Sequence, residues 1–162
     1  MAKVVIAAGS NLGDRHKYIS EAGLFLERIS SGPVKRSSIW ESEPVGPSRY
    51  HFLNAAASIE SNLPANKLLD LLKNHEVSAG REPDPARWMP RVIDLDIICI
   101  DHLVIRKESL IIPHSEYQNR LFVLFPLREI IPFWIDPVSG RTLDEMIMSA
   151  PAMEIEKTDL DW

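Results

Sequence analysis

The sequence has a single cysteine in 162 residues, so no disulfide can form within the chain. That cysteine, Cys99, lies in the apolar run DIICI, where we expect a buried and unreactive thiol. The apolar run near the start, VVIAA, is too short for a signal peptide or a membrane span. These shortages predict a cytoplasmic protein in a reducing compartment, with no membrane partner.

Positive charge is scarce as well. Lys and Arg total 18 against 23 Asp and Glu, which gives a net charge of −5. A mildly acidic chain binds nucleic acid poorly, so we expect no nucleic-acid partner, and any anionic ligand needs a local cluster of bases. The common nucleotide-binding loops are missing too, because neither G-x-x-x-x-G-K-[ST] nor G-x-G-x-x-G occurs.

The chain does have the length and the apolar content for one domain spanning residues 1–162. Hydrophobic patterns predict amphipathic helices at 15–30 and 63–80 and strands at 3–8, 34–40, 50–60 and 92–101. This order is typical of an α+β ferredoxin-like βαββαβ sandwich, with an antiparallel or mixed sheet and helices on one face. A C-terminal extension would hold an extended stretch at 109–114, a partly helical one at 117–130 and a short helix near 142–149.

The strand predicted at 50–60 alternates in character, which fits a sheet with one face covered and the other open to a ligand. Phe52 and Asn54 share the outward face, where an amide beside an aromatic ring would suit a flat heterocycle. Taken alone, this is more simply an ordinary surface pair. Phe122 is a candidate second ring, and His114 a candidate polar group, although a core aromatic and a structural histidine are the default interpretations.

Asp94 and Asp96 lie two residues apart on the strand predicted at 92–101, so both carboxylates leave the same face, about 7 Å apart at the backbone. Leu95 and Ile97 then point into the core. Two converging carboxylates suit Mg²⁺, which binds one or two carboxylates together with substrate phosphates. The spacing alone slightly favours a solvent-facing strand whose acids pair with neighbouring arginines.

Three arginines shift that balance. Arg81, Arg87 and Arg91 lie within eleven residues, on a segment that leads directly into the strand. Guanidinium groups bind phosphate oxygens with two parallel hydrogen bonds. Together with Trp88 and the two aspartates, they indicate a site for a nucleotide polyphosphate. Surface ion pairs with acidic residues of the same segment remain an alternative, for Arg87 in particular.

With these residues in place, the chain resembles the 6-hydroxymethyl-7,8-dihydropterin pyrophosphokinase family of folate biosynthesis. The resemblance runs in order through nearly the whole chain, and its last two elements are highly specific in combination. The matching segments are GSNLGDR (9–15), EPVGP (43–47), FLNAA (52–56), GR (80–81), RWMPRVIDLDI (87–97) and PHSEYQNRLFVLFPLREIIP (113–132).

The resemblance implies an enzyme that transfers pyrophosphate from its co-substrate ATP to the hydroxymethyl group of the pterin, releasing AMP. It also implies a ferredoxin-like fold and two Mg²⁺ ions bridged by Asp94 and Asp96. These two residues, with Arg81 and Arg91, form the expected catalytic group. Beyond the two small-molecule substrates we expect no partner, and we expect a monomer.

On the ATP side, the resemblance places Arg81 and Arg91 against the phosphates and Trp88 on a loop that closes over the substrates. The other residues it assigns to ATP are Glu76, Ile97 through its backbone, His114 and Arg120. Pro83 and Ser109 stand where many family members carry basic residues. These departures remove positive charge from the ATP side.

On the pterin side, the resemblance gives Phe52 and Phe122 as the two rings that enclose the pterin. Asn54 is its hydrogen-bonding amide, and Ser42 and Val45 offer backbone groups. Many members have tyrosine in place of Phe52, so a hydroxyl is lost while the stacking surface stays.

Two other classes of function remain as alternatives. The same carboxylates would serve a Mg²⁺-dependent phosphodiesterase or nuclease, although the acidic net charge and the aromatic–amide set argue against it. A non-catalytic ligand-sensing module on a ferredoxin-like sheet would bind its ligand without metal.

Overall fold

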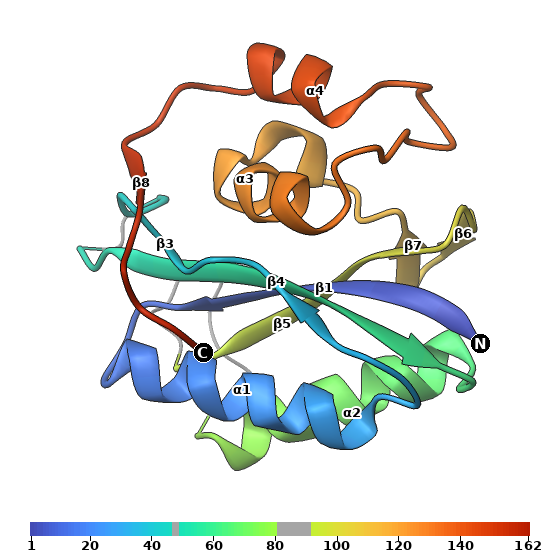
Figure 1. The fold of residues 1–162 in the computed structure, drawn as a ribbon, viewed down its shortest axis with the longest axis horizontal. Coiled ribbons are helices and arrows are strands. Elements are labelled where there is room, and N and C mark those ends of the chain that lie inside the picture. The colour runs from blue at the N-terminus through green and yellow to red at the C-terminus, as the bar shows by residue number, and fades with distance from the viewer. Residues whose placement is uncertain (47–48, 81–91) are drawn as a thin grey trace.

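An antiparallel sheet forms the centre of the computed structural model, which describes residues 1–46, 49–80 and 92–162 (Figure 1). Its strands run in the order β5-β1-β4-β3-β8, and β2 also pairs with β4. The strands of the sheet are β1 (Ala2–Ser10), β2 (Lys35–Arg36), β3 (Trp40–Ser42), β4 (Phe52–Ser61), β5 (Asp94–Ile100) and β8 (Ile155–Lys157). A separate pair, β6 (Ile105–Lys107) and β7 (Leu110–Ile112), follows β5.

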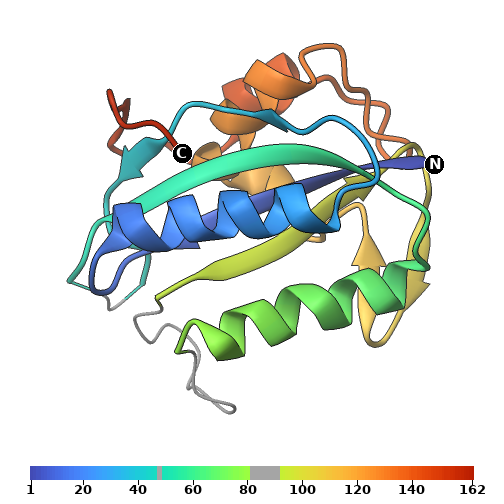
Figure 2. The same ribbon diagram turned by 60° about the horizontal axis from the view of Figure 1, so that its bottom comes forward.

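Helices cover both faces of this sheet. Helices α1 (Arg15–Ile29) and α2 (Ala65–Ser78) lie together on one face (Figure 2). On the other face lie α3 (Leu121–Ile130) and α4 (Leu143–Ser149), after a short 3₁₀ turn η1 (Tyr117–Asn119) (Figure 1). The chain thus has the predicted α+β sandwich, and α3 and α4 belong to the predicted C-terminal extension.

Local sequence explains where the first helices begin. Asp14 caps α1, because its carboxylate accepts a hydrogen bond from the Lys17 amide at 3.1 Å. Residues at helical spacing, among them Ile19 and Leu26, then bury one side of α1 against the sheet. Pro64 precedes α2, where a missing amide hydrogen costs nothing.

Two hydrophobic cores lie on either side of the sheet. Leu53 and Ile59 of β4 face α1 and α2, as their alternation predicts. Ala56, on the opposite face, is buried in the second core beneath α3. The prediction that this second face of β4 is open is therefore wrong for most of the strand. The face is open only at the Phe52 end, where it lines a cavity.

The strand predicted at 34–40 is two short strands separated by a bulge. Arg36 pairs with Ala57 and Trp40 with Asn54 of β4. The segment from Arg36 to Trp40 is therefore one residue longer than the stretch of β4 that it faces. Ser37 accommodates it, since its hydroxyl accepts the Ala56 amide hydrogen at 2.9 Å in place of a backbone carbonyl. Hydrophobic periodicity gives no sign of such a break.

The C-terminal extension returns to the sheet after α4. Strand β8 pairs with β3, with Ile155 opposite Ser42. The final residue, Trp162, donates a hydrogen bond from its indole nitrogen to the Ser37 carbonyl at 2.7 Å. Within the ranges that the structure describes, no helix is long and apolar enough to cross a membrane.

Candidate active site

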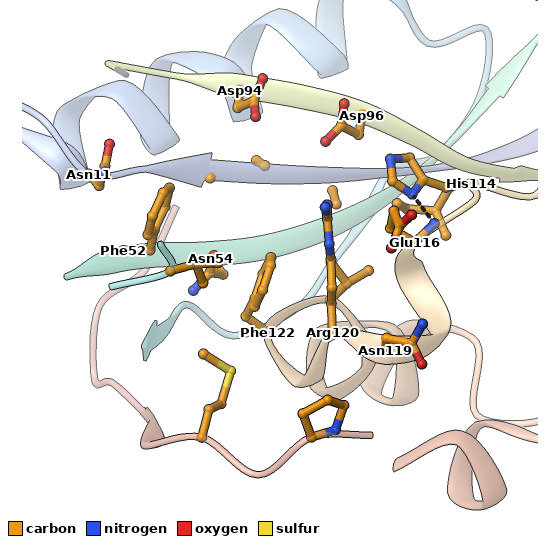
Figure 3. Close-up of a pocket in the computed structure, with 18 of the residues that line it drawn as sticks. Asn11, Phe52, Asn54, Asp94, Asp96, His114, Glu116, Asn119, Arg120 and Phe122 are labelled. Carbon is orange, nitrogen blue, oxygen red and sulfur yellow. Dashed lines mark hydrogen bonds between the residues drawn. The ribbon is translucent and has the colours of Figure 1, made fainter. Parts of the chain in front are cut away.

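A cavity of about 690 Å³ opens between the sheet and the C-terminal extension (Figure 3). Its walls come from β1, β4 and β5, from the segment 114–123 and from the segment between α4 and β8. It is the place where the sheet face is not covered by α3. Side chains from segments far apart in the sequence therefore meet in one space.

Small residues of β1 form the floor of this cavity. Gly9 of β1 lies between Asn54 of β4 and Asp94 of β5 in the register of the sheet. Ala7 in the same way separates Ala56 from Asp96. Because β1 carries no large side chain here, the groups on its two neighbours can reach a ligand lying across it.

Asp94 and Asp96 both line the cavity, whereas Leu95 and Ile97 point into the opposite core with only 1% and 4% of their surface exposed. The predicted parity of the strand is confirmed. The pKa of Asp96 is raised to about 7 by burial and by the neighbouring Asp94 and Glu76 carboxylates, against the opposing charges of Arg120 and Lys73. The site therefore holds negative charge that an added cation would stabilise.

This pair of carboxylates fits Mg²⁺. The ion prefers oxygen ligands and takes one or two carboxylates, leaving its other positions to water and phosphate oxygens. No group of three or more His, Cys, Asp or Glu side chains that could hold a metal occurs in the described part of the chain. The donor set thus matches a metal that is shared with a phosphate-bearing substrate, and it does not match a closed structural site.

Glu76 comes from α2 and lies beneath the two aspartates. Its side chain is only 2% exposed, and one carboxylate oxygen accepts a hydrogen bond from the Leu95 amide at 2.7 Å. Glu76 does not line the cavity. In this structure it acts on the site through β5, by fixing the strand between Asp94 and Asp96 and by raising the pKa of Asp96.

His114 and Arg120 face the aspartates from the other wall (Figure 3). The Nδ1 atom of His114 lies 3.1 Å from the Glu116 amide nitrogen, which donates to it. A neutral His114 ring therefore carries its proton on Nε2. Burial and the charge of Arg120 lower the pKa of His114, so the neutral form predominates at pH 7.

Phe52 and Phe122 lie on either side of Asn54 (Figure 3). The Asn54 amide nitrogen donates to the Ser42 hydroxyl at 2.8 Å, and both side chains are buried. This bond orients the amide, and its carbonyl oxygen and second N–H are the groups left for a ligand. Phe52, Asn54 and Phe122 form an aromatic–amide slot, and Asp94, Asp96, His114 and Arg120 form the charged side of the cavity. Arg120 packs over the Phe122 ring, with 5.8 Å between Cζ and the ring centroid, and so joins the slot to the charged side.

Comparison with known proteins identifies the family. Residues 5–132 match the family described as 7,8-dihydro-6-hydroxymethylpterin-pyrophosphokinase (HPPK). The chain belongs to the HPPK family. The predicted resemblance is confirmed, and with it the prediction of a pyrophosphokinase enzyme.

Relatives in bacteria support the same assignment. The chain is 43% identical over 127 residues to the 2-amino-4-hydroxy-6-hydroxymethyldihydropteridine pyrophosphokinase of Bacillus subtilis, a match that covers 77% of this chain and 75% of the relative. It is 36% identical over 157 residues to the enzyme of the same name from Pseudomonas aeruginosa, covering 96% of both chains.

A solved structure of HPPK-DHPS in complex with substrates shares the fold, with a TM-score of 0.71 at 13% identity. That match covers 91% of this chain but only 43% of the solved chain.

The structure brings most of the residues predicted for an HPPK site into the cavity. Those that line it are Val45, Phe52, Asn54, Asp94, Asp96, His114, Arg120 and Phe122. Ser42 lies behind the wall and holds Asn54, while the side chain of Ile97 is in the core and the next residue, Ile98, lines the cavity. Arg81, Trp88 and Arg91 lie outside the described residues, so their roles stay predictions.

Sequence reasoning missed several further cavity residues, among them Asn11, Lys73, Asn119 and Met153. Lys73 stands one helical turn before Glu76 on α2, so the helical spacing could have found it. It supplies positive charge near Asp96. Met153 has no local signal, because only the pairing of β8 with β3 brings its segment to the cavity.

Proposed function

We propose that this HPPK family member transfers the terminal pyrophosphate of ATP to 6-hydroxymethyl-7,8-dihydropterin in a Mg²⁺-dependent reaction of folate biosynthesis. The pterin hydroxyl oxygen forms a bond to the β-phosphorus. The bond from that phosphorus to the oxygen bridging to the α-phosphate breaks, AMP leaves with that oxygen, and the hydroxyl proton is released. One observation carries the proposal. A single cavity joins an aromatic–amide slot to a pair of carboxylates faced by a cationic side chain.

The slot suits a pterin because that ring is flat and its edge carries both hydrogen-bond donors and acceptors. Phe52 and Phe122 offer the two stacking faces, and Asn54 offers an amide oriented by Ser42. Each buried hydrogen bond that a wrong ligand leaves unmade costs about 1–3 kcal/mol, so the amide selects for a complementary edge. A pterin in the slot would present its hydroxymethyl group toward Asp94 and Asp96.

The charged side suits a polyphosphate. Arg120 provides a guanidinium for phosphate oxygens, and neutral His114 provides a hydrogen-bond donor at Nε2. Asp94 and Asp96 would hold Mg²⁺, which when bound would neutralise phosphate charge and lower the pKa of the pterin hydroxyl. The protein itself needs to supply little covalent chemistry, because aligning two bound reactants can remove about 7–11 kcal/mol of the barrier.

The test is an AMP-formation assay with the purified chain, ATP, MgCl₂ and the pterin. We expect AMP and the pterin diphosphate in equal amounts, with no AMP when pterin is omitted or EDTA is added. Asp96→Asn should abolish the product, whereas Asp70→Asn should not, because Asp70 is an exposed aspartate of α2 that does not line the cavity.

Other outcomes would replace the proposal. Cleavage of nucleic acid without pterin would indicate a phosphodiesterase or nuclease. Pterin binding that ignores EDTA, with no AMP formed under any condition, would indicate a sensing module.

A further inference from the structure

Residues 150–154, which join α4 to β8, form a wall of the cavity although they lie outside the family match at residues 5–132. Pro151, Ala152 and Met153 line the same space as Phe52 and Asn54. Figure 3 shows the ribbon of this segment along the side of the cavity that faces away from Asp94 and Asp96. The wall therefore lies across the cavity from the two aspartates (Figure 3).

This segment is held at both ends. On one side, the Ala150 amide donates to the Met146 carbonyl at 2.8 Å and ends α4. On the other, the Glu43 amide donates to the Glu154 carbonyl at 3.0 Å, and the Glu154 amide donates to the Glu43 carboxylate at 2.9 Å. Between these anchors Met153 packs, partly buried, against the core beneath α3.

The same anchors couple the wall to the slot. Strand β8 pairs with β3 so that Ile155 lies opposite Ser42, the residue that orients Asn54. Glu43 begins the stretch that leads to Val45, another cavity residue. The position of Met153 relative to Asn54 is thus fixed by paired backbone, which is the condition for a side chain to set the shape of a binding site.

We propose that Met153 determines specificity for the pterin, by closing the aromatic–amide slot on the side away from the aspartates. The inference rests on the proposed function for the identity of the ligand. A methionine suits this position because its thioether is apolar, adaptable and makes favourable contacts with aromatic rings. With Pro151 and Ala152 it gives an apolar wall, which excludes water from one edge of the bound ring.

Truncating the side chain tests the idea. In Met153→Ala we expect the pterin KM to rise about tenfold, because apolar contact with the ring is lost. The ATP KM and kcat should stay within about twofold of wild type, since the wall lies across the cavity from the two aspartates (Figure 3). Met153→Leu, of similar volume, should restore the pterin KM to within about threefold of wild type.

Met148→Ala is the matched control. Met148 lies on α4, close in sequence, but it is 88% exposed and does not line the cavity. The same substitution there should leave all three kinetic constants unchanged. Pterin binding without ATP, measured by calorimetry on each full-length variant, should follow the pterin KM.

The outcomes separate the two proposals. A wild-type chain that forms no AMP from pterin and ATP contradicts the proposed function. An active wild type, with a pterin KM in Met153→Ala within twofold of it, overturns the role of Met153. Equal rises in the pterin and ATP KM also overturn it, because they indicate a general structural effect. Should Met153→Ala fail to fold, Met153→Gln keeps the side-chain length, and an unchanged pterin KM in that variant would refute the inference.

Discussion

Replacing Asp96 by asparagine should stabilise the ligand-free protein while removing its activity. Asp96 is partly buried at the cavity wall, close to the carboxylates of Asp94 and Glu76, and its pKa is raised to about 7. A raised pKa means that the folded state disfavours the charged carboxylate. Asparagine has nearly the same shape and carries no charge, so it removes that penalty.

The magnitude follows from the pKa. A rise from 3.8 to about 7 corresponds to an upper limit of about 4 kcal/mol at pH above 7. Water in the open cavity screens part of this electrostatic penalty, and we expect Asp96→Asn to gain about 1–2 kcal/mol in the free energy of unfolding. For a chain of this size that is a gain of roughly 2–8 °C in Tm.

The pH dependence gives the sign. Between pH 3.8 and about 7 the folded wild type binds a proton at Asp96 that the unfolded chain has lost, so wild-type stability falls as pH rises through this window. Asp96→Asn does not lose stability in this way. The difference in the free energy of unfolding between this variant and wild type should therefore grow from about pH 4 and level off above about pH 7.

The assay is thermal unfolding of wild type, Asp96→Asn and the surface control Asp70→Asn at pH 4 to 8, each with and without MgCl₂. Without metal, only Asp96→Asn should show the growing advantage. With Mg²⁺ and a non-hydrolysable ATP analogue, the wild type should gain stability that Asp96→Asn does not. A stability difference between Asp96→Asn and wild type that stays constant with pH, or that shrinks as pH rises, would refute this account of the site.

Three further predictions follow from the same structure. Asn54→Ala should weaken pterin binding, measured by calorimetry, about tenfold or more and leave ATP binding unchanged, since it removes the amide held by Ser42. Equal weakening of both ligands would contradict the assignment of the aromatic–amide slot to the pterin. Burial raises the pKa of the Cys99 thiol to about 12, so iodoacetamide at pH 8 should label the protein in urea but not in its native state; rapid native labelling would contradict this. Asp136→Ala should lower the free energy of unfolding, measured by urea titration, by about 2–4 kcal/mol, because Asp136 accepts hydrogen bonds from the Tyr117 hydroxyl and from the Val138 and Ser139 amides. A loss under about 0.5 kcal/mol would show that these bonds are dispensable.

Local pattern is enough to predict the parts of the site that lie on single strands. A strand places every second side chain on one face, so the amino-acid sequence alone pairs Asp94 with Asp96 and Phe52 with Asn54. The order of strands and helices is sufficient for the fold class, and the register then brings both pairs to the same sheet face across Gly9.

The remainder depends on contacts between distant segments. The wall at Met153 requires β8 to pair with β3, more than a hundred residues away in the sequence, and no local periodicity encodes that pairing. The bulge at Ser37 depends on a side-chain hydroxyl replacing a backbone acceptor, which hydrophobic pattern does not show. The covering of β4 by α3 escaped prediction for the same reason, because alternation along a strand does not reveal what packs on it.

The position of the aspartates has a consequence for how the molecule behaves in a crowded solution. Strand β5 stands at the end of the described sheet, where unpaired backbone groups can recruit a strand from another molecule. The buried carboxylate of Glu76 already accepts a hydrogen bond from the Leu95 amide, between Asp94 and Asp96 on that strand. An intruding strand would have to displace a buried carboxylate and lie beside Asp94 and Asp96. The acids of the proposed ligand site thus also protect this edge of the sheet from aggregation.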